Sequence, residues 1–149
     1  MAHHPHWGLH CAPDPPDDAP LPAPPSPPRI EPMSFLLRFD PADLGPPEEG
    51  APLPERIVSG DPRSRTWNLE TLPDGALFAG VWESTPGAWH VDYEEWEFCT
   101  LIEGISVLHE EGEAPVRLQA GDTFVLRPGF KGIWEVIETT RKLYVVRLI

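Results

Sequence analysis

Residues 89–104 read "WHVDYEEWEFCTLIEG" and decide the fold class, because apolar and polar side chains alternate along a run rich in aromatic and branched residues. That alternation predicts two β-strands rather than a helix. The same run holds an imidazole, His90, and two carboxylates, Asp92 and Glu97. It therefore raises the question of whether these polar groups form a solvated face or a metal-binding or catalytic site inside a β-barrel.

The pattern on either side of this run extends the prediction to a whole domain. Short apolar-alternating segments are separated by turn signals such as "PDG" at 73–75 and "AGD" at 120–122, and helical periodicity never persists. Short strands at this spacing are typical of a sandwich or a closed barrel. The predicted strands are residues 56–60, 65–70, 76–84, 88–93, 97–104, 105–111, 115–119, 122–127, 132–138 and 141–149.

Charge and cysteine content narrow the partners and the compartment. The 149 residues carry 11 Lys and Arg against 24 Asp and Glu, a formal net charge of -13, which repels phosphate backbones and anionic lipids. We therefore expect no nucleic-acid and no membrane partner. The two cysteines, Cys11 and Cys99, form no spaced framework, and no apolar run is long enough for a transmembrane helix, so a cytoplasmic location is expected.

Proline content divides the chain into three parts. Residues 1–32 hold about half of the 21 prolines and few bulky apolar residues, which predicts a disordered tail. Residues 33–54 are predicted to form an extended N-terminal arm, and residues 55–149 the barrel. The tail also carries side chains that could catch a metal ion without the fixed geometry of a built site: His3, His4, His6, His10 and Cys11.

Three blocks carry a resemblance to a known family: "GVWESTPGAWHVDYEEWEFCTLIEG" at 80–104, "LQAGDTFVLRPGFKGIWEV" at 118–136 and "RKLYVV" at 141–146. They resemble the small single-domain cupins related to the ethanolamine-utilisation and ureidoglycine aminohydrolase-like group. The resemblance spans roughly residues 55–149. It implies an all-β, RmlC-like cupin fold, the double-stranded β-helix or jelly-roll barrel, and it leaves the reaction open because cupins carry many functions.

The same resemblance implies a metal motif that this chain keeps only in part. In metal-binding cupins a His-x-His pair, a Glu and a Gly follow in fixed spacing, which sets His90 and Asp92 at the two histidine positions, with Glu97 and Gly104 after them. The second motif normally brings another histidine, and here that position is Gly132. The implied ligands are therefore His90, Asp92 and Glu97, for one divalent ion (Mn, Fe, Ni or Zn).

The strand pattern alone allows two orientations of this set. His90 and Asp92 share one face of a strand, and Trp89, Val91 and Tyr93 share the other. Charged residues are mostly solvated, which favours the aromatic face as core. The resemblance favours the opposite orientation, with His90, Asp92 and Glu97 in the barrel interior.

The interior orientation leads to a functional hypothesis with an alternative. Glu97 and His90 are the predicted catalytic acid and base, or metal ligands, acting on a small polar metabolite. The alternative is a metal-free ligand-binding or regulatory cupin without catalysis. A purely structural role for Glu97 is also open, in which it ties down a neighbouring strand through Tyr93, Tyr144, Lys142 or a tryptophan N–H. In either case we expect a homodimer with a small-molecule ligand. The predicted ligand-binding residues are Trp82, Asp92, Cys99, Trp134 and Tyr144.

Overall fold

The computed structural model describes residues 34–149. The chain divides into two compact units, Met1–Arg38 and Phe39–Ile149. The tail predicted for residues 1–32, with its histidines, lies outside the described residues. In the described end of the first unit, the Ser34 hydroxyl donates to the Leu36 carbonyl at 3.1 Å, and the Leu36 N–H donates to the Ser34 oxygen at 3.2 Å.

The second unit is built from strands, which confirms the all-β prediction. Its one helical element is a short 3-10 turn, η1, and residues 34–149 contain no helix that could cross a membrane. In chain order the elements are β1 (Glu48–Gly50), η1 (Pro54–Arg56), β2 (Ile57–Gly60), β3 (Ser64–Thr71), β4 (Leu77–Ser84), β5 (Gly87–Asp92), β6 (Trp96–Glu110), β7 (Val116–Gln119), β8 (Thr123–Leu126) and β9 (Lys131–Arg147).

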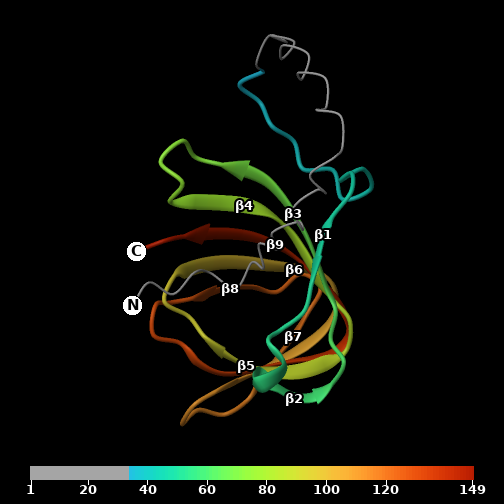
Figure 1. Ribbon diagram of the computed structural model, residues 1–149, viewed down its shortest axis with the longest axis vertical. Coiled ribbons are helices and arrows are strands. Elements are labelled where there is room, and N and C mark those ends of the chain that lie inside the picture. The colour runs from blue at the N-terminus through green and yellow to red at the C-terminus, as the bar shows by residue number, and fades with distance from the viewer. Residues whose placement is uncertain (1–33) are drawn as a thin grey trace, which may run out of the picture. The chain divides into compact units, whose positions relative to one another are not determined.

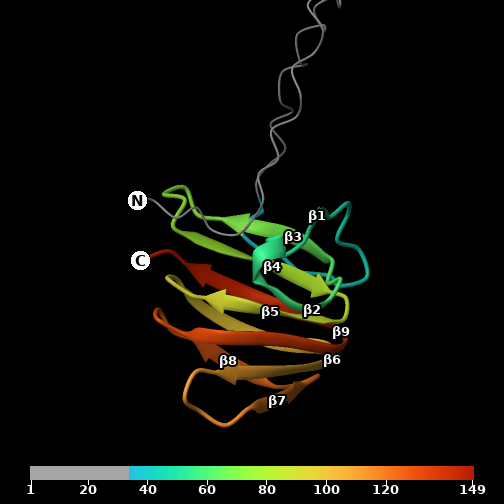
Figure 2. The same cartoon turned by 60° about the horizontal axis from the view of Figure 1, so that its bottom comes forward.

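Two long strands, β6 and β9, join the two sides of the barrel. The first half of β9 pairs with β5 and the second half with β4, while β6 runs antiparallel to β9 over almost its whole length. The strand order is β1-β3-β4-β9-β5-β2, and β6 adds β7 and β8. Figures 1 and 2 show the result: the sheet curls so that β3, β4 and β8 lie across the interior from β5, β2 and β7, and the long strands β6 and β9 each run through both sides.

Each long strand was predicted as two strands, and the structure shows why they are continuous. The β6–β9 pairing shifts register three times between Leu101 and Ser106, where the strands bend. Gly104 sits in this bend with φ 86°, and a Cβ there would lie 2.1 Å from the carbonyl oxygen of Thr139. Glycine thus lets the ladder bend while hydrogen bonding continues, a β-bulge that polarity patterns do not distinguish from a turn.

The hydrophobic core lies between the two sides of the barrel. Trp89 from β5, Leu101 and Leu108 from β6, and Trp134 and Val136 from β9 are all buried in one cluster. A further set of inward-facing residues packs against this cluster but stays partly exposed: Trp82, Val91, Tyr93, Phe124 and Phe130.

The outer side of β4 and β9 is covered by the chain that precedes β1. The Trp67 indole N–H donates to the carbonyl of Gly45 at 2.9 Å, and Arg141 donates to the carbonyl of Pro41 at 3.2 Å. Arg141 also donates to the buried Glu83 carboxylate at 2.9 Å, and its guanidinium lies 5.2 Å from the Trp67 ring centroid. These contacts hold the outer face of β9 at Arg141, the residue next to Lys142.

Candidate functional site

An ion pair lies inside the barrel. The Lys142 ammonium donates to the Glu97 carboxylate at 2.6 Å, and the two side chains are only 5% and 3% exposed. Alternation explains their position, because Glu97, Cys99 and Leu101 point inward from β6 as Lys142 and Tyr144 do from β9. Burying either charge alone would cost several kcal/mol, so each residue depends on the other as its partner in the interior.

Two tryptophan rings also lie beside the Lys142 ammonium. Lys142 Nζ lies 4.8 Å from the ring centroid of Trp82 and 4.5 Å from that of Trp134. The two rings meet edge to face with their centroids 5.6 Å apart. Because an aromatic face attracts a cation, this arrangement stabilises the charged form of the lysine in a dry environment. It also places aromatic walls beside the charged pair.

A chain of hydrogen bonds holds Trp134 in place. Its indole N–H donates to the Ser106 hydroxyl at 3.2 Å, and Ser106 and Thr140 share a hydrogen bond of 2.7 Å. Thr140 donates its single proton to the carbonyl of Glu138 at 2.9 Å. Ser106 must therefore be the donor to Thr140, so the chain runs in one direction from the indole to the backbone. Thr140 and Ser106 are completely buried, and this chain leaves no freedom to their hydroxyl groups.

Cys99 and the two tyrosines surround the pair and are held neutral. Burial raises the pKa of the Cys99 thiol far above its ordinary value, and Lys142 offsets this only in part. Burial, together with the nearby Glu97 carboxylate, likewise raises the pKa of Tyr93 and of Tyr144. Tyr144 donates to the side-chain oxygen of Asn68 at 3.0 Å. Cys99 is therefore a thiol rather than a thiolate nucleophile.

The pKa of Lys142 responds to opposing influences. Burial alone would lower it, but the neighbouring Glu97 carboxylate, which also accepts a hydrogen bond from the amine, outweighs that effect, and the pKa lies above its ordinary value. The amine therefore stays protonated at neutral pH. In that form it donates hydrogen bonds and stabilises negative charge, but it cannot form a Schiff base.

His90 and Asp92 do not join this site. The prediction that they face the interior together with Glu97 is wrong, because both are exposed on the outer face of β5 while Trp89 and Val91 point into the core. The aromatic face proved to be the buried one, as the general solvation of charged residues favours. The exposed positions of His90 and Asp92 do not support the predicted roles of His90 in acid/base catalysis and of Asp92 as a ligand-binding residue in the interior.

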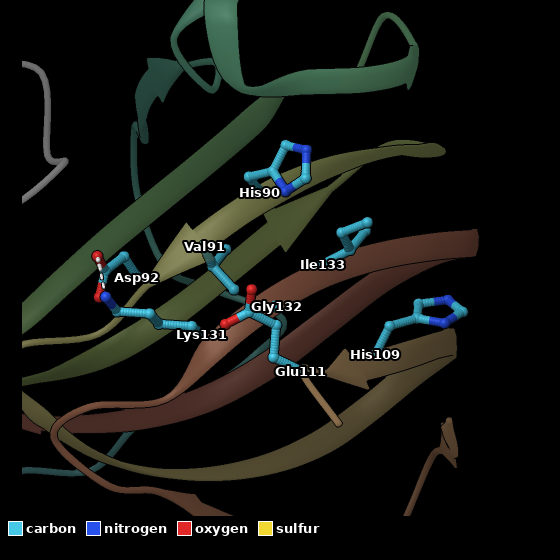
Figure 3. Close-up of a pocket in the computed structure, with 8 residues that line it drawn as sticks. All are labelled: His90, Val91, Asp92, His109, Glu111, Lys131, Gly132 and Ile133. Atoms are coloured by element: carbon cyan, nitrogen blue, oxygen red, sulfur yellow. Dashed lines mark ion pairs between the residues drawn. The ribbon is translucent and has the colours of Figure 1, made fainter. Parts of the chain in front are cut away.

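On the outside, His90 and Asp92 border an open hollow of about 250 Å³ (Figure 3). His90 and His109 lie on either side of Ile133, and Lys131 approaches Asp92 at 3.8 Å. His109 contacts the Glu135 carboxylate at 3.1 Å. These pairs are substantially exposed, so their interactions are weakened by solvent.

The predicted metal site does not fit this arrangement. Among residues 34–149, no group of three or more His, Cys, Asp or Glu side chains is placed to hold a metal ion. Of the three implied ligands only Glu97 is inside, and one of its oxygens is taken by Lys142. At Gly132, where a second-motif histidine was expected, a Cβ would lie 2.0 Å from the carbonyl oxygen of His109, so no side chain fits without moving the backbone.

Lys142 belongs to the candidate site, although the sequence predicted for it only a possible structural contact with Glu97. The signal was available in the alternation of "TRKLYVV" at 140–146, where Thr140, Lys142 and Tyr144 share one face. Lysine is rarely buried unless it is paired, so a lysine on the same strand face as a buried tyrosine predicts an acidic partner. Of the other predicted ligand-binding residues, Trp82, Cys99, Trp134 and Tyr144 all lie on the interior side with Glu97.

The antiparallel strands curl around a hydrophobic core that holds one buried ion pair, and two long bent strands carry both sides, an arrangement typical of a cupin barrel. Residues 71–144 match the family model of the EutQ-like cupin domain. The chain is a small cupin of the EutQ-like group, which confirms the family and the jelly-roll fold indicated by the sequence. No curated protein matches the chain.

Solved structures show the same fold. A protein of unknown function of the DUF861 family from Pseudomonas syringae pv. tomato is 31% identical, with TM-score 0.66 over 72% of this chain and 46% of its own. The EutQ protein of Clostridium difficile is 22% identical, with TM-score 0.52 over 58% of this chain and 63% of its own. A predicted oxalate decarboxylase from Thermotoga maritima is 17% identical, with TM-score 0.59 over 76% of this chain and 100% of its own. This chain thus spans less than two thirds of the first two relatives.

Proposed function

We propose that this cupin binds a small polar metabolite inside the barrel, at the Glu97–Lys142 pair. The observation that carries the proposal is the buried pair itself, a hydrogen-bond acceptor and a cation 2.6 Å apart, with the cation beside two tryptophan rings. Ligand sites are typically apolar and aromatic, with a few convergent polar groups. This interior has that composition.

The pair also suggests the chemistry of the ligand. Lys142 donates to a carboxylate or carbonyl oxygen, and Glu97 accepts from a hydroxyl or amino group, so a small compound carrying both kinds of group suits the pair. Trp82 remains partly exposed although it faces the core, which supports a position at the border between the interior and solvent. Its ring would cover the apolar part of the ligand.

A catalytic role for Glu97 is the second candidate, favoured by its contact with a donor that stays protonated at neutral pH. In this version Glu97 removes a proton from the bound metabolite, and the Lys142 ammonium stabilises the negative charge that develops on an adjacent oxygen. Neither His90 nor a metal takes part. The pure binding function needs the same residues and no proton transfer, so turnover distinguishes the two candidates.

Binding is tested by tryptophan fluorescence with a panel of small hydroxy acids, keto acids and amino acids. We expect at least one compound to give a saturable change that is lost in Glu97→Gln and reduced in Trp82→Phe. The matched controls are His90→Ala and Asp92→Asn on the outer face, which should bind as the wild type does. A response that depends on His90 and not on Glu97 would refute the interior site.

Several broader expectations stay predictions. The net charge of -13 supports the absence of nucleic-acid and anionic-membrane partners and fits a cytoplasmic location. The homodimer is supported by exposed apolar side chains on the outside of β6 and β8, where Phe98 pairs with Val125 and both are about 40% exposed. Sedimentation equilibrium of the full chain measures the oligomeric state.

A further inference from the structure

The buried carboxylate of Glu97 needs a positive charge, and within residues 34–149 the Lys142 ammonium supplies it. Metal-binding cupins, which the sequence resembles, answer the same need with a divalent ion. Here the ammonium of Lys142 lies 2.6 Å from Glu97 Oε1, close enough for a charge-assisted hydrogen bond. Arg141, the next residue, points to the opposite face, where Glu83 and Trp67 hold it.

The surroundings of the ammonium are suited to a monovalent cation rather than a metal ion. Its next neighbours are the faces of Trp82 and Trp134, which attract a cation but offer no lone pair for coordination. Three further polar neighbours, Cys99, Tyr93 and Tyr144, are held neutral with raised pKa values, whereas metals bind the thiolate or phenolate form.

No side-chain nitrogen or oxygen buried in the described part of the chain lacks a hydrogen-bond partner. In this part of the chain, no buried side-chain nitrogen or oxygen therefore needs a metal ion as its partner.

We infer that the Lys142 ammonium is the resident cation of this barrel, tethered to β9 and occupying the place beside Glu97 where a divalent ion would otherwise neutralise the carboxylate. The inference goes beyond the proposed function, since it holds whether or not a metabolite binds. It predicts that the interior of the native protein excludes metal. It also predicts that removing the lysine side chain creates a site for a free alkylammonium ion.

The first test needs no change in the interior. The full-length chain is incubated with Mn²⁺, Fe²⁺, Ni²⁺ or Zn²⁺, dialysed, and its metal content measured. Because the tail histidines could bind metal on their own, a variant with His3, His4, His6 and His10 replaced by alanine is measured in parallel. We expect this tail variant to retain no stoichiometric metal. One equivalent retained by the tail variant and lost on adding Glu97→Gln would overturn the inference.

The second test uses chemical rescue of Lys142→Ala. We expect its lowered melting temperature to rise saturably with propylammonium or butylammonium, while n-butanol, similar in shape but uncharged, has no such effect. Wild type and Lys131→Ala, which loses an exposed lysine, should not respond. A folded Lys142→Ala protein that responds equally to amine and alcohol, or to neither, would overturn the inference. If this variant does not fold, the metal measurement still decides.

Both tests are independent of the metabolite. Failure of the fluorescence screen would leave the resident cation intact. Retention of one interior metal ion would remove the resident cation but leave a ligand site at Glu97. The two proposals can therefore fail separately.

Discussion

The inner and outer faces of the barrel each carry a lysine–carboxylate pair, but the inner pair is buried and the outer pair is exposed to solvent. Inside, Lys142 and Glu97 meet at 2.6 Å with 5% and 3% of their side chains exposed. Outside, Lys131 and Asp92 approach to 3.8 Å with 60% and 51% exposed. The motif spacing in the sequence made Asp92 of the outer pair a candidate site residue, yet solvent weakens the interaction within such an exposed pair. The difference shows that burial, rather than the presence of charged residues near one another, marks the candidate site.

The largest expected effect comes from breaking the inner pair. Lys142→Met leaves the Glu97 carboxylate buried without a cation, and we expect a loss of about 3–5 kcal/mol in the free energy of unfolding. The double variant Lys142→Met/Glu97→Leu should regain most of this loss, because a buried ion pair replaced by apolar groups is often roughly neutral. Urea denaturation of the wild type, Lys142→Met, Glu97→Leu and the double variant measures the coupling energy between the two side chains.

The outer pair supplies the control for that cycle. Lys131→Met and Asp92→Asn should each change the free energy of unfolding by about 1 kcal/mol or less, and by less still at high salt. Comparable losses from the inner and outer substitutions would contradict the contrast between the two faces.

A smaller effect is expected from the buried hydroxyl chain that holds Trp134. Thr140→Val removes the acceptor of the Ser106 proton, and we expect a loss of about 1–3 kcal/mol together with a changed tryptophan spectrum. The matched control is Thr100→Val, since Thr100 and Thr123 form a 3.1 Å hydroxyl pair on the outside. That substitution should cost about 0.5 kcal/mol or less. Near-ultraviolet circular dichroism and thermal denaturation check both.

The smallest effect concerns alkaline pH. The pKa of the Cys99 thiol is raised from its ordinary value of 9.0, so above pH 9.0 the unfolded chain releases this proton while the folded chain keeps it. Stability therefore falls as pH rises, by about 1.4 kcal/mol per pH unit for one such group. Lys142, Tyr93 and Tyr144, also with raised pKa values, add losses of the same sign at higher pH.

Cys99→Ala isolates the contribution of the thiol. Between pH 8 and pH 10 this variant should lose about 1.4 kcal/mol less than the wild type, whatever its stability at pH 7. Urea midpoints at several pH values give the comparison. Parallel pH profiles for the two proteins would mean that the thiol is not protected by burial.

The sequence predicted the strands well and the orientation of the candidate site poorly. Alternation fixes which residues share a face, and it correctly grouped His90 with Asp92 and separated them from Trp89. It does not say which face is inside, since this depends on where other strands pack. The family motif favoured the face that turned out to be solvated, and at Gly132 the backbone leaves no space for the histidine that the second motif normally brings.

Glu97 was predicted correctly as an interior residue, but its partner was not assigned to the site. Lys142 lies 45 positions away in the chain, and its contact depends on the antiparallel pairing of β6 with β9. Periodicity within one strand cannot predict such a register. The bend at Gly104 raised a similar difficulty, since a glycine that bends a continuous strand resembles one that ends it.

The contacts behind β9 have a practical consequence. Arg141 and Lys142 are adjacent, so the backbone that carries the interior ammonium is also held by the bond from Arg141 to Pro41, 100 positions earlier in the chain. Shortening the N-terminus for expression or crystallisation should therefore stop before Phe39. A deletion reaching Gly45 would strip the covering from Trp67 and Arg141 and loosen the support of the charged centre, although no residue of that centre had been touched.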